Sequence, residues 1–168
     1  MGSSLGFRTD LMLLTLQGSI IEKRDGYLCV RTPSDPAFRW GNFILLDTAP
    51  LLGSLKKWID AFRHEFPYAN YLAIGIDNTN GDAFAADELQ VERVDSESCR
   101  VMTATTVAPP SRQDSGTIIR VLDRDNDNDW DAAIALQVAN NTEEDPVGYE
   151  AFLVRRMASM RALQREGH

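Results

Sequence analysis

A tight turn between two strand-like runs constrains the fold of this chain more than any other short stretch. Residues 19–24 and 27–32 are rich in branched and aromatic side chains, and Asp25 and Gly26 separate the two runs. An Asp-Gly pair supplies the positive φ that a two-residue hairpin turn requires. The sequence therefore predicts an antiparallel β-hairpin, and with it a fold built on a sheet.

The segments that follow alternate between strand and helix patterns. Residues 38–46 are rich in β-forming side chains and predict a third antiparallel strand. Apolar residues recur at helical spacing over 51–66, and Pro67 ends that helix. Beyond it the sequence predicts a buried strand at 71–76, a short helix at 83–89, and two strands at 90–94 and 100–106.

A polar stretch with two prolines, residues 109–116, is typical of a linker. It divides the chain into a first unit at 1–108 and a second unit at 117–168. The second unit is predicted to contain a strand at 117–122, a helix with Asp129 as its N-cap, and a last helix from Pro146 to a capping Gly167.

The charge of the chain restricts its partners. Its 168 residues include 25 acidic and 17 basic side chains, which gives a net charge of −8 at pH 7. Such a surface, without a segregated basic patch, repels phosphate backbones and anionic lipid, so we expect no nucleic acid and no membrane as partner. The apolar stretch at 11–16 is too short for a membrane span and lacks the flanks of a signal peptide. Cys29 and Cys99 fall in no metal-binding or redox spacing, so we expect both in the core of a cytoplasmic protein.

Two possible chemical motifs have simpler explanations. The acidic run at 123–131 has the alternating carboxylates of a calcium loop, but Asn128 stands where that loop needs Gly and Ile134 where it needs Glu. Carboxylates that favour the positive end of the next helix explain the run without an ion. The two histidines, His64 and His168, have no neighbours that indicate a triad or a metal pair. The sequence therefore assigns no catalytic residue and no metal ligand.

Residues 38–43 combine three aromatic rings, a cation and an amide, and two interpretations of them stay open. In one, they form a core strand with a bulge at Gly41, Trp40 is buried, and the segment matters to stability more than to chemistry. In the other, they form a wall of a binding cleft, where Trp40 supplies apolar area and Asn42 a polar anchor.

Four stretches together resemble the front part of GNAT-family N-acetyltransferases that are built from two tandem units: residues 5–12, 31–33, 38–43 and 167–168. The resemblance implies an α/β fold of the α+β type, with a mixed, mostly antiparallel sheet flanked by helices. It also implies that 1–108 is a degenerate GNAT-like unit, and that 117–168 holds the first strand and the first two helices of a second, incomplete unit.

The chain departs from that family at the loop that would hold acetyl-CoA. GNAT enzymes bind the pyrophosphate on an Arg/Gln-x-x-Gly-x-Gly/Ala loop at a helix N-terminus. The equivalent residues here, 47–54, keep one glycine, lack the leading Arg or Gln, and add the opposing charge of Asp47. Residues 113–118 imitate the motif but lead into a predicted strand, and the helix near Ala83 offers no Tyr as general acid. We therefore assign no cofactor-binding residue in this chain, and acetyl-CoA is implied only for a full-length relative.

Two functions follow as expectations. The first is the N-terminal, non-catalytic portion of a GNAT-type N-acetyltransferase, whose acceptor would be a small-molecule amine. In the family the turn between the first two helices lines the acceptor site, which implies cleft positions at Asn140, Asn141, Glu143, Glu144 and Asp145. The second is a free-standing, non-enzymatic binding or dimerisation module with a GNAT-like fold.

The second unit also suggests a homodimer. Its two predicted helices present many apolar side chains to a sheet of which the chain supplies a single strand, and monomers rarely leave such a surface exposed. The residues concerned are Trp130, Ile134, Val138, Tyr149, Phe152, Leu153, Met157 and Met160.

Overall fold

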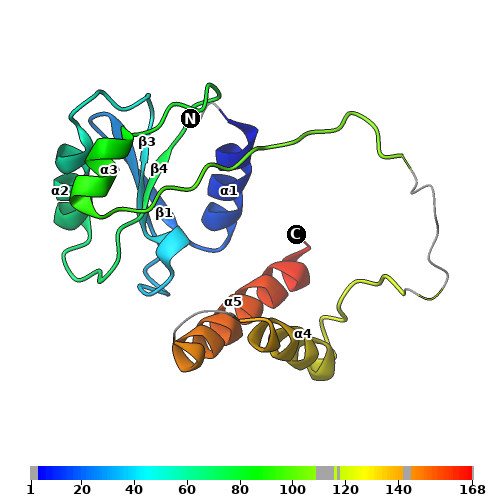
Figure 1. Ribbon diagram of the computed structural model, residues 1–168. Coiled ribbons are helices and arrows are strands. Elements are labelled where there is room, and N and C mark those ends of the chain that lie inside the picture. Colours follow the sequence, from blue (N-terminus) through cyan, green and yellow to red (C-terminus); the bar gives the residue numbers. More distant parts are fainter. Residues whose placement is uncertain (1–3, 109–115, 117, 142–144, 168) are drawn as a thin grey trace. The chain divides into compact units, whose positions relative to one another are not determined.

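The computed structural model describes residues 4–108, 116, 118–141 and 145–167, and the chain divides into two compact units, Met1–Val101 and Met102–His168 (Figure 1). Each unit is described by itself. Within the described residues, no helix has both the length and the apolar character that crossing a bilayer would require.

The first unit is a four-stranded mixed sheet between helices (Figure 1). The sheet order is β1-β2-β3-β4, in which the first two pairings are antiparallel and β4 runs parallel to β3. The predicted mixed, mostly antiparallel sheet flanked by helices is therefore confirmed at the level of fold class. The elements are α1 (Leu5–Leu16), β1 (Ile20–Arg24), β2 (Tyr27–Arg31), the 3-10 turn η1 (Arg39–Gly41), β3 (Phe43–Leu46), α2 (Leu55–Glu65), β4 (Ile74–Ile76) and α3 (Ala86–Glu92).

The predicted hairpin is confirmed. Arg24 faces Tyr27 across the turn, and Gly26 has a φ of +81°, a value that a residue with a Cβ adopts only with strain. From there the register runs to Ile20 opposite Arg31, so the turn aligns the full length of both strands.

Helices cover both faces of this sheet (Figure 1). Helix α1 lies on one face, where it approaches Ile21 and Leu28, and α2 lies on the other, where Trp58 meets the ring of Tyr27 edge to face. Strand β3 runs through the middle and all four of its residues are buried. The core therefore extends through both layers; its buried members are Leu11, Leu14, Val30, Phe43, Ile44, Leu45, Leu46, Trp58, Phe62 and Ala73.

Several predicted elements of the first unit differ from the structure. The strand expected at 38–46 is a 3-10 turn followed by β3, and no strand forms at 90–94 or at 100–106. The short helix predicted at 83–89 does form, but it spans Ala86–Glu92 and includes the start of the strand predicted at 90–94; Asp87 and Glu88 lie in its first turn, where carboxylates favour a helix. Helix α1 was not predicted at all. It begins at Ser4, whose hydroxyl accepts from the backbone N–H of Phe7, while the carboxylate of Asp77 accepts from the backbone N–H of Ser4.

The second unit is a pair of helices, α4 (Asp127–Ala139) and α5 (Pro146–Glu166), packed against each other around Trp130, Leu153 and Met157. Both predicted helices are confirmed, as is the Gly167 cap, whose φ is +92°. The strand predicted at 117–122 does not form in the described residues 118–122. The bond from Arg120 to Asp129 instead holds this segment beside the start of α4.

The N-cap of α4 is Asn126, and the prediction of Asp129 was wrong. Asp129 lies inside the helix, where its carboxylate accepts from Arg120, from the backbone N–H of Asp123 and from Asn126. The Arg120 guanidinium and the Asp123 N–H lower the pKa of Asp129 to about 2. The carboxylate of Asp129, one of those in the acidic run, thus binds the segment that precedes α4 to the helix.

Candidate functional site

Trp40 and Asn42 lie in the loop between β2 and β3, where they do not form the wall of a cleft. Asn42 is 5 % exposed; its Oδ1 accepts from the backbone N–H of Thr32 at 2.9 Å, and its Nδ2 donates to the carbonyls of Asp35 and Phe38 at 2.9 Å each. The amide therefore closes the loop on itself and is not a polar anchor for a ligand. A Cβ at Gly41 would collide with the side chains of Phe38 and Thr32, and Gly41 lies in a 3-10 turn and not in the expected strand bulge.

Trp40 lies on the surface, so the expectation that it is buried was wrong. Its side chain is 60 % exposed and meets Phe43 edge to face, with ring centroids 6.1 Å apart. Residues Arg39–Gly41 form a 3-10 turn and not a strand, so their side chains do not alternate between the two faces of the sheet. The indole of Trp40 therefore points to solvent. Exposure leaves the ring available for contact, although the cavity described below does not include it.

A cluster of charges fixes the C-terminal end of α2 to the hairpin. Glu65, whose side chain is 7 % exposed, accepts from Arg24 Nε at 3.0 Å, from Tyr27 Oη at 2.8 Å and from Arg31. Burial alone would raise the pKa of Glu65, but the hydrogen bonds from Tyr27, Arg31 and Arg24 outweigh it and lower the pKa to about 2. Because the same carboxylate is bonded three times, this cluster is structural and holds no free acid or base.

The two cysteines lie in different environments. Cys29 is fully buried in β2, and this burial raises the pKa of its thiol to about 12, so it is protonated and unreactive at neutral pH. Cys99 is exposed, which corrects the expectation that it lies in the core.

The resemblance implies a pyrophosphate site at the N-terminus of α2, and in the structure a side chain of the protein occupies this terminus. Glu88, on α3, accepts from the backbone N–H of Leu55 at 3.0 Å and from that of Gly53. The side chain of Ser54 donates to the carbonyl of Leu51 and does not cap the helix. Two of the backbone N–H groups that could meet a phosphate, those of Gly53 and Leu55, are therefore already bonded to a carboxylate, and the pyrophosphate of acetyl-CoA would have to displace it.

The predicted acceptor-side residues lie around the turn between α4 and α5. Asn140 ends α4 and donates from Nδ2 to the carbonyl of Leu136 at 2.7 Å. Asp145 is the N-cap of α5 and accepts from the backbone N–H of Gly148 at 2.9 Å. Asn141 is half-buried beside them, and Glu143 and Glu144 lie outside the described residues. Asn140, Asn141 and Asp145 thus lie on the two sides of one turn, and Asn140 and Asp145 cap the helices that flank it.

The acidic run forms ion pairs. Asp127 pairs with Arg161 at 2.7 Å, and Asp125 lies 3.9 Å from Arg165. In the described part of the chain, His, Cys, Asp and Glu side chains form no group of three or more that could hold a metal ion.

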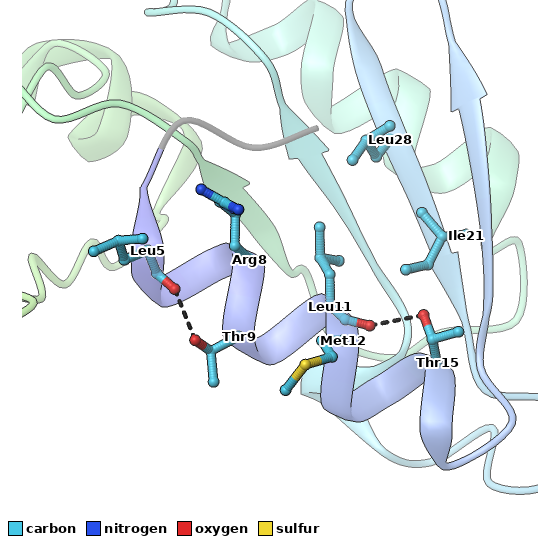
Figure 2. Close-up of a pocket in the computed structure, with 8 residues that line it drawn as sticks. All are labelled: Leu5, Arg8, Thr9, Leu11, Met12, Thr15, Ile21 and Leu28. Atoms are coloured by element: carbon cyan, nitrogen blue, oxygen red, sulfur yellow. Dashed lines mark hydrogen bonds between the residues drawn. The ribbon is translucent and has the colours of Figure 1, made fainter.

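An open cavity lies beside α1, over β1 and β2 (Figure 2). We call it the α1 groove. Its volume is about 580 Å³, within the range of small-molecule sites. It is lined by Leu5, Arg8, Thr9, Leu11, Met12, Thr15, Ile21 and Leu28. The groove could not be predicted from the sequence because α1 itself was not predicted; the helical spacing of Leu5, Arg8, Met12 and Thr15 is a signal for it.

Comparison with protein-family models, with curated proteins and with solved structures finds no match for this chain.

Proposed function

We propose that this chain is the N-terminal, non-catalytic portion of a GNAT-type N-acetyltransferase, a family that transfers an acyl group from acetyl-CoA to an amine. The topology supports this proposal: three antiparallel strands are followed by a helix that leads into a strand parallel to the third. The resemblance implies this order followed by a helix and a closing pair of strands; α3 forms, but the closing strands do not form in the described residues 90–94 and 100–106. In this proposal the protein is cytoplasmic, in keeping with its free cysteines.

The bond network at the start of α2 is the observation that carries the non-catalytic part of the proposal. A phosphate at this position would have to displace Glu88 from two backbone N–H groups, and Asp47 follows β3 directly in the loop leading to them. Both carboxylates repel an anion at this position. In this proposal the first unit therefore has no catalytic role and serves as a folded domain to which the catalytic unit docks.

We expect this chain to show no heat of binding with acetyl-CoA at micromolar concentrations. Isothermal titration calorimetry checks this, with Glu88→Gln and the exposed-site control Asp60→Asn as companions. The Glu88→Gln variant loses the competing negative charge, but its amide still occupies the start of α2. We therefore do not expect this variant to bind acetyl-CoA with micromolar affinity. A dissociation constant in the low micromolar range for the wild type would contradict the proposal.

The reading frame beyond codon 168 tests the rest of the proposal. We expect it to continue into a strand and an Arg/Gln-x-x-Gly-x-Gly/Ala loop, and the longer protein to release free CoA from acetyl-CoA when amines are supplied. In that protein Asn140, Asn141, Glu143, Glu144 and Asp145 would line the amine site. A stop codon, or a continuation without the loop, would contradict it and favour the second candidate.

The second candidate is a free-standing binding or dimerisation module, and exposed apolar side chains on both helices of the second unit favour it. Leu136 on α4 and Val147, Val154 and Met160 on α5 are all exposed, although Trp130, Leu153 and Met157 are covered by the helix pair itself. Burial of such side chains in a symmetric pair would stabilise a homodimer.

We expect light scattering across a dilution series to show a concentration-dependent dimer. Val154→Asp, at an exposed position of α5, should shift the series toward monomer without loss of helix content. Val91→Asp, on the exposed surface of α3 in the first unit, is the matched control and should leave the dimer intact. A wild-type monomer at every concentration would refute the dimer.

A further inference from the structure

The α1 groove has an apolar floor and a single cation. Leu11 of α1 points toward Ile21 and Leu28 of the hairpin, whereas Met12 lines the groove from the exposed surface of the helix and points away from the hairpin (Figure 2). Met12 is 54 % exposed, although burial of its thioether chain would be favourable by ~1.5–3 kcal/mol. An apolar body lying in the groove would gain from covering such side chains.

The polar side chains of the groove differ in what they can still bind. Thr9 donates its hydroxyl proton to the carbonyl of Leu5 at 2.9 Å, and Thr15 donates to that of Leu11 at 2.8 Å (Figure 2). Both hydroxyl protons are therefore used within α1, and the threonines add methyl groups to the lining. Arg8 is different, because no carboxylate among the described residues pairs with its guanidinium.

Charge in the groove is opposite to that of the chain as a whole. The net charge of the protein is −8, yet none of the eight described residues that line the groove is acidic. An anion next to Arg8 thus meets a planar set of donors suited to a carboxylate, with no acidic side chain in the lining to oppose it. A cation there would meet Arg8 without compensation.

From these observations we propose that the α1 groove binds a single-chain amphiphile with a carboxylate head, whose alkyl chain lies on Leu11, Met12, Ile21 and Leu28 and whose head pairs with Arg8. Arg8 and Thr15 are two helical turns apart, which is roughly 10 Å at the rise of an α-helix. The groove therefore offers an apolar path beside the cation that covers a large part of an alkyl chain, and its volume of about 580 Å³ admits that part. This function is independent of acyl transfer.

Dodecanoate, used below the concentration at which it forms micelles, is the probe. We expect calorimetry to show binding, and amide resonances of α1, β1 and β2 to shift in NMR spectra of the full chain. Dodecan-1-ol and dodecyltrimethylammonium have the same chain without the anion, and each should bind about tenfold more weakly or not at all, because a charge-assisted pair contributes about that factor.

Two variants separate the head from the chain. Arg8→Gln should weaken dodecanoate binding about tenfold and leave dodecan-1-ol unaffected. Met12→Glu, at an exposed position, should abolish dodecanoate binding without lowering the melting temperature. Lys57→Gln makes the same charge change as Arg8→Gln on α2, on the other face of the sheet, and should change nothing. Equal affinity for the three probes, an unaffected Arg8→Gln variant, or no dodecanoate binding by the wild type would each overturn the proposal.

Discussion

Replacing Phe62 with alanine is expected to lower the free energy of unfolding of the first unit by ~3–5 kcal/mol. Phe62 lies on the sheet side of α2, is fully buried, and packs against Phe66 and Tyr71 with ring centroids 5.0 and 5.8 Å away. The substitution removes a whole ring and leaves a cavity that the neighbouring side chains fill only in part. A domain is typically stable by ~5–15 kcal/mol, so the loss is a large fraction of the total.

Trp40→Ala is the matched comparison, because it removes an even larger ring from the surface. With 60 % of the side chain exposed and one edge contact to Phe43, we expect a cost of about 1 kcal/mol or less. Urea unfolding followed by circular dichroism measures both variants. If Trp40→Ala cost as much as Phe62→Ala, the indole would be part of the core, contrary to the structure.

The elements predicted correctly are those with local causes. The hairpin needs only Asp25 and Gly26 and their flanks, and α5 has Pro146 at its start and Gly167 at its end. The signals of helix α1 are weaker, because Leu5, Leu13 and Leu16 are exposed while Leu11 and Leu14 are buried, so apolar residues surround the helix and obscure its helical period.

The functional features depended on contacts that no local pattern shows. Glu88 reaches α2 from more than thirty residues away in the chain, and a single sequence does not indicate which N–H groups its carboxylate meets. Asn42 looked like a polar anchor because an amide beside aromatic rings is common in clefts, whereas its bonds to Thr32 and Asp35 are set by the path of the loop. The α1 groove needs both a helix and a hairpin to exist, so its lining could not be assembled before α1 was known.

The second large effect is expected at Glu65. Glu65→Gln keeps the size of the side chain but removes the charge that Arg24 and Arg31 face. Gln can accept fewer charge-assisted hydrogen bonds, and two guanidinium groups lose their partner, so we expect the unfolding free energy at pH 7 to fall by about 2–3 kcal/mol. This value is below that of a fully buried pair because the side chains of Arg24 and Arg31 are 35 % and 29 % exposed.

The pH dependence distinguishes a lost charge from a general loss of packing. The pKa of Glu65 is about 2 in the folded protein and near its ordinary 4.5 when the chain is unfolded. Between these values the unfolded state binds more protons, so this contribution to stability is complete above about pH 5 and is lost as the pH falls toward 2. The stability difference between wild type and Glu65→Gln should therefore be largest at neutral pH and shrink across that window.

Asp60→Asn is the matched control on the same helix. Asp60 pairs with Lys56 at the surface, where both side chains are more than 60 % exposed, and such pairs contribute little to stability. Urea unfolding at pH 7, 5, 4 and 3 should give nearly parallel curves for wild type and Asp60→Asn, and converging curves for wild type and Glu65→Gln. A constant difference for Glu65→Gln across the series would mean that the substitution acts through packing, and that the carboxylate does not hold α2 to the hairpin by its charge.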